Sequence, residues 1–228
     1  MKCWAISDTH GMHGQLKVPE GIDIVLCAGD ISNSKNRAIN SNEVMNFLTW
    51  WDKLNIDIKI LIAGNHDTSI ESGLVKPNDF TKTSSYLEHE QFMVSWYDGR
   101  EIKIFGSPYT PTFGDGWAFN KNRGKLDSYW KEMPNNLDIL ITHGPPKSIL
   151  DLSENRDGIL EQCGDTALYN HVLEKKPRFH MFGHIHNFKT CRNQGTFMHE
   201  GITFINASCV EDGRFDRGLT SNGVIFEL

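Results

Sequence analysis

Short runs of apolar and β-branched residues recur along the chain, separated by polar turns. Each run spans four to eight residues, which is the length of a buried strand rather than of a helix. We predict nine strands, at 3–7, 22–27, 56–63, 92–96, 101–105, 138–142, 179–182, 202–205 and 223–226. An Asp98-Gly99 pair separates the fourth run from the fifth, so these two are predicted to form a β-hairpin.

Two segments follow a helical spacing instead. The apolar positions over 41–54 fall on one stripe, which we expect to face the core: Val44, Phe47, Leu48 and Trp51. Asn40 is the expected cap of this helix, and Glu43 completes a capping box with it. A second helix is expected to begin after Asp165 and to end before Pro177. Strands that alternate with helices early and cluster late predict a mixed α/β fold.

Length and composition describe an ordinary globular protein. The 228 residues suit one domain, so 1–228 is predicted to be a single domain. Lys plus Arg total 23 and Asp plus Glu total 29, and the net charge of 23 − 29 = −6 disfavours a stable complex with long nucleic acid. No apolar run approaches the roughly 18 residues of a membrane span. With no C-x-x-C pair among five cysteines and no room for a signal peptide before Asp8, we expect a cytoplasmic protein.

Five of the predicted strands run into residues that bind metal ions. The following segments are Asp8-Thr9-His10, Gly29-Asp30, Gly64-Asn65-His66-Asp67, His143 and Gly183-His184-Ile185-His186. Sheets of α/β proteins carry their ligand sites at the carboxyl ends of strands. Imidazole nitrogen and hard oxygen without thiolate suit Mn, Fe, Zn, Co or Ni. Two ions that share one carboxylate would use all the candidate ligands: Asp8, His10, Asp30, Asn65, His143, His184 and His186.

In this order, the five segments resemble the signature of the calcineurin-like metallophosphoesterases, which reads D-x-H, G-D, G-N-H-[DE], H and G-H-x-H. Further segments are similar to its 239AB-type branch, small metallophosphodiesterases grouped with the class III cyclic nucleotide phosphodiesterases: 106–111, 116–120, 142–146, 182–186 and 205–208. The resemblance implies a four-layer α/β/β/α sandwich without a separate cap domain.

The resemblance also implies a role for each matching residue. The first ion would be held by Asp8, His10, Asp30 and His186, and the second by Asp30, Asn65, His143 and His184. Two divalent ions, Mn²⁺ first among them, would deprotonate a shared water that attacks phosphorus in line with the departing oxygen. His66 would protonate that oxygen, and Asp67 would orient His66. The implied activity is hydrolysis of small phosphodiesters, with cyclic nucleotides as candidate substrates.

The stretch 106–134 is rich in aromatic residues amid Gly, Pro and Asn. It is interpreted either as a lid near the site or as a cluster packed under a loop. The candidates for contacting a nucleoside base or a phosphate are Asn33, Trp117, Phe119 and Asn120.

Three alternatives compete with a phosphodiesterase. Phosphoprotein phosphatases, as phosphomonoesterases, usually carry an arginine in G-D-x-x-D-R, whereas Asp30 is followed here by Ile-Ser-Asn-Ser. A nuclease would need a track of basic residues to bind the phosphates of long nucleic acid, and the net charge of −6 disfavours one. A catalytically silent scaffold of the same fold would have lost ligands, whereas this set is intact. The expected partner is therefore a small phosphoester or nucleotide substrate.

Overall fold

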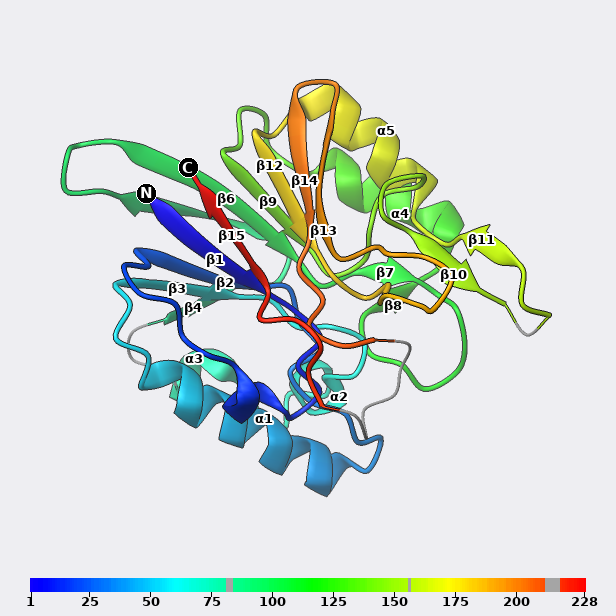
Figure 1. Cartoon of the computed structure of the whole chain (residues 1–228), viewed down its shortest axis with the longest axis horizontal. Coiled ribbons are helices and arrows are strands. Elements are labelled where there is room, and N and C mark those ends of the chain that lie inside the picture. The colour runs from blue at the N-terminus through cyan, green and yellow to red at the C-terminus, as the bar shows by residue number, and fades with distance from the viewer. Residues whose placement is uncertain (81–83, 156, 212–217) are drawn as a thin grey trace.

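The computed structural model describes residues 1–80, 84–155, 157–211 and 218–228 (Figure 1). Two sheets lie face to face, and helices cover the outer face of each sheet. The four layers therefore follow the order helix, sheet, sheet, helix, which confirms the predicted α/β/β/α sandwich.

The first sheet has the strand order β15-β1-β2-β3-β4. Its strands are β1 (Lys2–Ile6), β2 (Ile24–Cys27), β3 (Ile58–Leu61), β4 (Ser84–Tyr86) and β15 (Val224–Glu227). Strands β1 to β4 are parallel, and β15 pairs antiparallel with β1. Three helices lie below this sheet in Figure 1: α1 (Arg37–Asp52), α2 (Thr68–Glu71) and α3 (Pro77–Phe80). A short 3-10 turn, η1 (His13–Gln15), precedes β2.

The second sheet has the strand order β13-β14-β12-β9-β6-β5. Its strands are β5 (Glu90–Ser95), β6 (Glu101–Ser107), β9 (Ile139–Thr142), β12 (Phe179–Phe182), β13 (Gly195–His199) and β14 (Ile202–Asn206). The four central strands are parallel, and the edge strands β13 and β5 are antiparallel to their neighbours. Helices α4 (Arg123–Lys131) and α5 (Thr166–Lys175) cover its outer face.

Two short strand pairs complete the architecture. Strands β7 (Thr110–Pro111) and β8 (Asn120–Lys121) pair in parallel, and β10 (Leu152–Glu154) with β11 (Leu160–Gln162) forms an antiparallel hairpin that projects from the body of the molecule (Figure 1). In the described part of the chain, no helix is long and apolar enough to cross a membrane.

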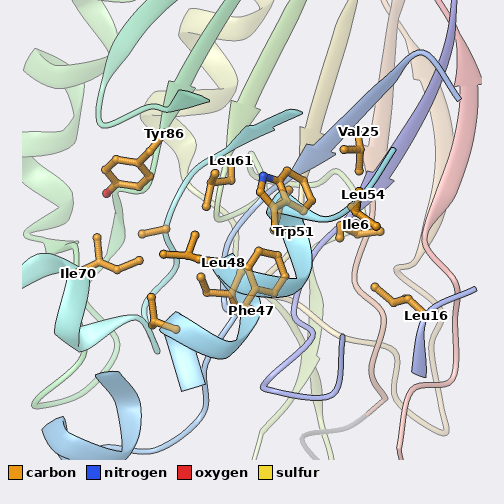
Figure 2. Packing of buried hydrophobic residues seen from close by; sticks show 14 of the residues in the cluster. Ile6, Leu16, Val25, Phe47, Leu48, Trp51, Leu54, Leu61, Ile70 and Tyr86 are labelled. Atoms are coloured by element: carbon orange, nitrogen blue, oxygen red, sulfur yellow. The ribbon is translucent and has the colours of Figure 1, made fainter. Parts of the chain in front are cut away.

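Each sheet contributes one face to a shared apolar layer. Because side chains alternate along a strand, β1 directs Ala5 between the two sheets and Trp4 toward the helices. A second apolar layer lies between α1 and the first sheet. Figure 2 shows this layer, in which Phe47 and Trp51 lie against side chains of the sheet such as Val25. This packing anchors α1 on the first sheet.

All nine predicted strands are present, and β5 and β6 form the predicted hairpin, with Gly99 at φ 84° in its turn. Helix α5 begins after Asp165 as predicted. The predicted start of α1 is wrong: Asn36 caps the helix by accepting from the backbone N–H groups of Ala38 and Ile39. Asn40 therefore lies inside the helix, where it is fully buried. Helix α4, within 106–134, was not predicted.

We predict that Trp51→Ala destabilises the protein by about 3–5 kcal/mol, because a fully buried indole would leave a cavity under α1. The measurement is the free energy of unfolding in urea. Met45→Ala is the control on the same helix, since Met45 is 39% exposed and its loss is expected to cost less than about 0.5 kcal/mol. Equal effects of the two substitutions would contradict the packing described.

Candidate metal centre

The carboxyl ends of parallel strands from both sheets meet at one edge of the sandwich. Asp8 and Asp30 follow strands β1 and β2 of the first sheet, while His143 and His184 follow β9 and β12 of the second. The loop after β3 adds Asn65 and His66. The sandwich thus brings side chains from five separate loops to one place, as the parallel topology requires.

Candidate ligand atoms converge in three overlapping groups, within each of which the atoms lie within 4.8 Å of one another. The groups are Asp8 with His10 and His186, His10 with Asp30 and His66, and Asp30 with His143 and His184. Asn65 joins the third group, because its Oδ1 lies 2.9 Å from His143 Nε2. All seven ligands proposed from the sequence therefore lie at this centre.

Asp30 lies between the two sides of the centre. Its Oδ1 is 3.4 Å from His143 Nε2, and its Oδ2 is 3.9 Å from His10 Nε2. One carboxylate oxygen thus faces each side. Asp8, on the far side, approaches His186 with 3.2 Å between Oδ1 and Nε2.

Backbone carbonyls orient two of the histidine ligands. His143 Nδ1 lies 2.7 Å from the carbonyl oxygen of Ala28, and His10 Nδ1 lies 3.2 Å from that of Ser32. A carbonyl only accepts, so Nδ1 of each ring donates to it and Nε2 faces the centre. Burial opposes a charge on His143, but the Asp30 carboxylate raises the pKa of this ring to about 9, so its Nε2 carries a proton at pH 7 that a bound cation would displace.

The backbone of the centre is constrained by positive φ angles and by close contacts at two glycines. Asp8, His10, Asp30 and His184 all have positive φ, between 45° and 67°, a conformation that costs non-glycine residues free energy. A Cβ on Gly64 would collide with the Asp30 carboxylate, and a Cβ on Gly183 would collide with that of Asp8. Glycine is thus required at both positions because another chain segment's carboxylate occupies the space.

The electrostatics of the buried groups suit cation binding. Burial alone raises the pKa of the Asp30 carboxyl, but the imidazoles of His143, His66 and His10 hold it well below its usual range. Burial likewise opposes ionisation of Asp8, but a hydrogen bond from His186 lowers its pKa to about 2. Burial lowers the pKa of His10 and of His184 to about 3, so both rings are neutral at pH 7.

Asp67 has a different role from the one predicted. Its carboxylate accepts from the backbone N–H groups of Ser32 and Gly64, at 3.0 and 2.7 Å, and from the Ser32 hydroxyl at 2.7 Å. The contact to His66 Nδ1 comes instead from the carbonyl oxygen of Asn33, at 3.1 Å. The prediction that Asp67 orients His66 is therefore corrected: Asp67 ties together the loops after β2 and β3. Burial and the nearby Asp30 raise the pKa of Asp67 to about 6.

Two residues of α1 hold the same loops and were not recognised from the sequence. The Asn40 amide donates to the Ser32 hydroxyl at 3.0 Å and to the carbonyls of Ser34 and His66 at 2.8 Å each. Its carbonyl oxygen accepts from the Ser69 N–H at 2.9 Å. The Glu43 carboxylate accepts from the backbone N–H groups of Asn33 and Ser34, at 2.8 and 2.9 Å. Glu43 is therefore not part of a capping box.

Buried polar side chains also hold the loops of the second sheet. The Thr142 hydroxyl donates to the Gly144 carbonyl at 2.7 Å, so His180 Nε2, 2.8 Å from that hydroxyl, must donate to it. Asn206 Nδ2 donates to the Ile185 carbonyl at 2.9 Å. These bonds fix the backbone on either side of His143 and between His184 and His186.

The four candidate substrate contacts separate into two pairs. Trp117 lies beside the centre, with its ring centroid 4.4 Å from that of His66, and Asn33 contacts His66 through its carbonyl. Phe119 is only 2% exposed and belongs to the core under α1, which corrects its predicted substrate role. The Asn120 amide donates to the Thr110 hydroxyl and the Ala118 carbonyl, within its own loop. The stretch 106–134 is thus partly a packed cluster and partly a wall of the site.

The residues present fit a pair of divalent cations. Carboxylate, amide and imidazole donors without thiolate match Mn, Fe, Zn, Co or Ni. The close approach of backbone at Gly64 and Gly183 lets the two aspartates and the histidines converge without intervening side chains. The chain therefore offers a buried anionic cradle for hard or borderline cations.

Comparison with known proteins agrees with this geometry. The family of calcineurin-like phosphoesterases matches residues 1–188. The human protein "Metallophosphoesterase domain-containing protein 1" is 32% identical over 89% of the chain. An Emericella nidulans protein named "Probable rhamnogalacturonate lyase C" is 37% identical over 79% of it. The chain spans 64% of the human protein's length and 16% of the fungal protein's.

A solved structure shares the fold. The phosphopantetheinyl hydrolase of Mycobacterium tuberculosis superposes with a TM-score of 0.57 and 16% identity, and the match covers 95% of this chain and 91% of that one.

We predict that Asn40→Ala destabilises the protein by about 2–3 kcal/mol, because buried partners in two loops lose their hydrogen bonds. Unfolding in urea gives the value. The exposed Asn42 on the same helix provides the matched control, and Asn42→Ala is expected to change stability by less than about 0.5 kcal/mol. A neutral Asn40→Ala variant would show that the α1 contacts do not hold these loops.

We also predict that Mn²⁺ stabilises the protein through Asp30. With free Mn²⁺ at about 100 times the Kd, one bound ion adds about 2.7 kcal/mol, which raises Tm by roughly 5–10 °C in a chain of this size. Asp30→Asn removes the charge that faces both sides of the centre and is expected to abolish the shift. Asp79→Asn, at an exposed position, should retain it. A full Mn²⁺ shift in Asp30→Asn would contradict the role given to Asp30.

Proposed function

The chain belongs to the calcineurin-like phosphoesterase family, and from this membership we propose that it is a dinuclear, metal-dependent hydrolase of small phosphodiesters. The observation that carries the proposal is the position of Asp30, whose two oxygens face ligands on opposite sides of the centre. Such a carboxylate is suited to bridge two cations. Within the family we propose the 239AB-type branch, supported by the Gly-Trp-Ala-Phe-Asn segment at 116–120.

Each half of the centre has its own ligand set in this proposal. Asp8, His10 and His186 would hold one ion together with Asp30. Asn65, His143 and His184 would hold the other, again with Asp30. Mn²⁺ is the proposed metal. When bound, the ions would supply a nucleophilic hydroxide at neutral pH and offset negative charge on the phosphoryl oxygens.

His66 is suited to act as the general acid. Its Nδ1 faces the Asn33 carbonyl, so that proton is retained in a hydrogen bond. Its Nε2 faces the centre, 3.9 Å from Asp30 Oδ2, and would give its proton to the departing oxygen. Glu43 contributes indirectly, because it holds the Asn33 N–H and hence the carbonyl that orients the ring.

Trp117 and Lys35 form the rim of the site on the His66 side. The Lys35 ammonium lies 3.8 Å from the centroid of the Trp117 ring, which in turn contacts His66. The positive charge would attract an anionic ester, and the aromatic face beside it would pack against a carbon group of that ester. A small phosphodiester or nucleotide is therefore the proposed substrate. The proposed location is the cytoplasm.

We predict that His66→Ala affects hydrolysis according to the leaving group. For a diester with a poor alkoxide leaving group, such as a 2′,3′-cyclic nucleotide, kcat should fall about 100-fold or more, since general acids contribute roughly 10²–10⁴-fold. For bis(p-nitrophenyl) phosphate the loss should be much smaller, because p-nitrophenolate departs without a proton. The measurement is kcat for both substrates with Mn²⁺-loaded protein.

Metal content provides the internal check, because His66 is assigned to proton transfer and not to the ligand set. Inductively coupled plasma mass spectrometry should find the same Mn per chain in His66→Ala as in the parent protein. His199→Ala is the control and should leave both kcat values intact, because His199 pairs with Ile202 at the amino end of β14, whereas the centre lies at the carboxyl ends of the parallel strands. Equal losses for the two substrates, or loss of metal, would contradict the general-acid role.

A further inference from the structure

A cavity of about 290 Å³ lies directly beside the metal centre. His184 belongs both to its lining and to the group formed with Asp30 and His143. The other walls come from the stretch that holds β7, from the loop after β9 and from the β10–β11 hairpin. Any group bound next to His184 therefore has immediate access to this cavity.

The lining is mostly apolar and includes proline and phenylalanine rings. Pro111, Phe113, Pro145 and Ile185 provide hydrophobic surface, and Cys163 adds a thiol whose pKa is raised by burial. Among the described residues that line the cavity, Arg123 is the one with a permanent charge, and its guanidinium donates to the carbonyls of Gly164 and Cys163 at 3.1 and 3.0 Å. These bonds hold the guanidinium at the pocket wall, where its face can contact a ring.

Phe113 connects the cavity to the catalytic rim. Its ring is 50% exposed, stacks on Trp117 at 5.8 Å and 22°, and lies 5.0 Å from the ring of His184. Since Trp117 contacts His66, the aromatic row runs from the cavity at His184 to the general acid at the other end. The two ends of the row can thus receive two different substituents of one phosphorus atom.

We propose that this cavity binds an aromatic ring on the alcohol that stays attached to phosphorus during hydrolysis. The inference rests on the proposed function, in which water adds to phosphorus, the bond to the leaving oxygen breaks and His66 protonates that oxygen. The other ester bond stays intact, and its carbon group occupies the cavity. A monoester has no such second group, so the cavity selects diesters.

The cavity is large enough for one ring system. An enclosed cavity of about 150 Å³ binds benzene, so about 290 Å³ has room for a phenyl group or a nucleobase. Proline, phenylalanine and arginine faces favour a planar ring over a saturated one. Phenyl and nucleobase esters share this chemistry, and the experiment separates them.

The test uses p-nitrophenyl diesters that share one leaving group and differ in the retained group. That group is methyl, cyclohexyl, phenyl or 5′-thymidine, and kcat/KM is measured with the Mn²⁺-loaded full chain. We expect the phenyl ester to exceed the methyl ester by about 10-fold or more. A thymidine ester above the phenyl ester would identify a nucleobase as the natural ring, and the reverse order a simple aryl group. Equal values for methyl and phenyl, or for cyclohexyl and phenyl, would overturn the inference.

Two variants connect the effect to the cavity. Ser153, half-buried on β10, lines it, and Ser153→Phe would fill it and bring the phenyl-to-methyl ratio of kcat/KM down to about 1. Ser95→Phe makes the same substitution at an exposed position of β5 and should keep a ratio of about 10. Phe113→Ala removes only a half-exposed ring and should also lower the phenyl-to-methyl ratio of kcat/KM. It is the test to use if Ser153→Phe does not fold.

The failures of the two proposals are distinguishable. If no ester of the series is hydrolysed with Mn²⁺, the proposed function fails. If the esters are hydrolysed but Ser153→Phe keeps the ratio of the parent protein, the hydrolase stands and the ring pocket is wrong.

Discussion

The cost of burying two carboxylates at one point dominates this structure. Asp8 and Asp30 are almost fully enclosed, and an enclosed anion is tolerated only when cations or hydrogen-bond donors surround it. The fold meets this demand by directing histidines from both sheets toward them. It also accepts positive φ angles at four of the residues involved. Such a concentration of carboxylate oxygen and imidazole nitrogen is well suited to divalent cations.

The centre could be predicted from the sequence because its determinants are local. Strands are short apolar runs, and in a parallel sheet the residues that follow each run meet at the same edge. Asp8, Asp30 and Asn65 follow neighbouring strands of the first sheet and are therefore predictable as one group, whereas His143 was joined to them by the order of the five segments. The layer order followed from resemblance to a family, whereas the nine strands followed from the pattern alone.

The features that could not be predicted from the sequence depend mainly on contacts between segments that are distant in the chain. Asn40 has the sequence context of a helix cap, and only the packing of α1 against two loops shows that it bonds to both. Asp67 follows His66 directly, which suggested a contact, yet the turn after β3 aims its carboxylate at the backbone of the neighbouring loop. Helix α4 has only nine residues and lies in a stretch rich in loop-forming residues. The cavity beside His184 has walls from at least four separate segments, so no local sequence pattern predicts it.

If Asp30 bridges two cations, anomalous diffraction from crystals grown with Mn²⁺ should show both of them. We expect two anomalous peaks about 3.5–4 Å apart, with one carboxylate oxygen of Asp30 directed at each. A single peak, or peaks that do not contact Asp30, would contradict the bridging role of Asp30.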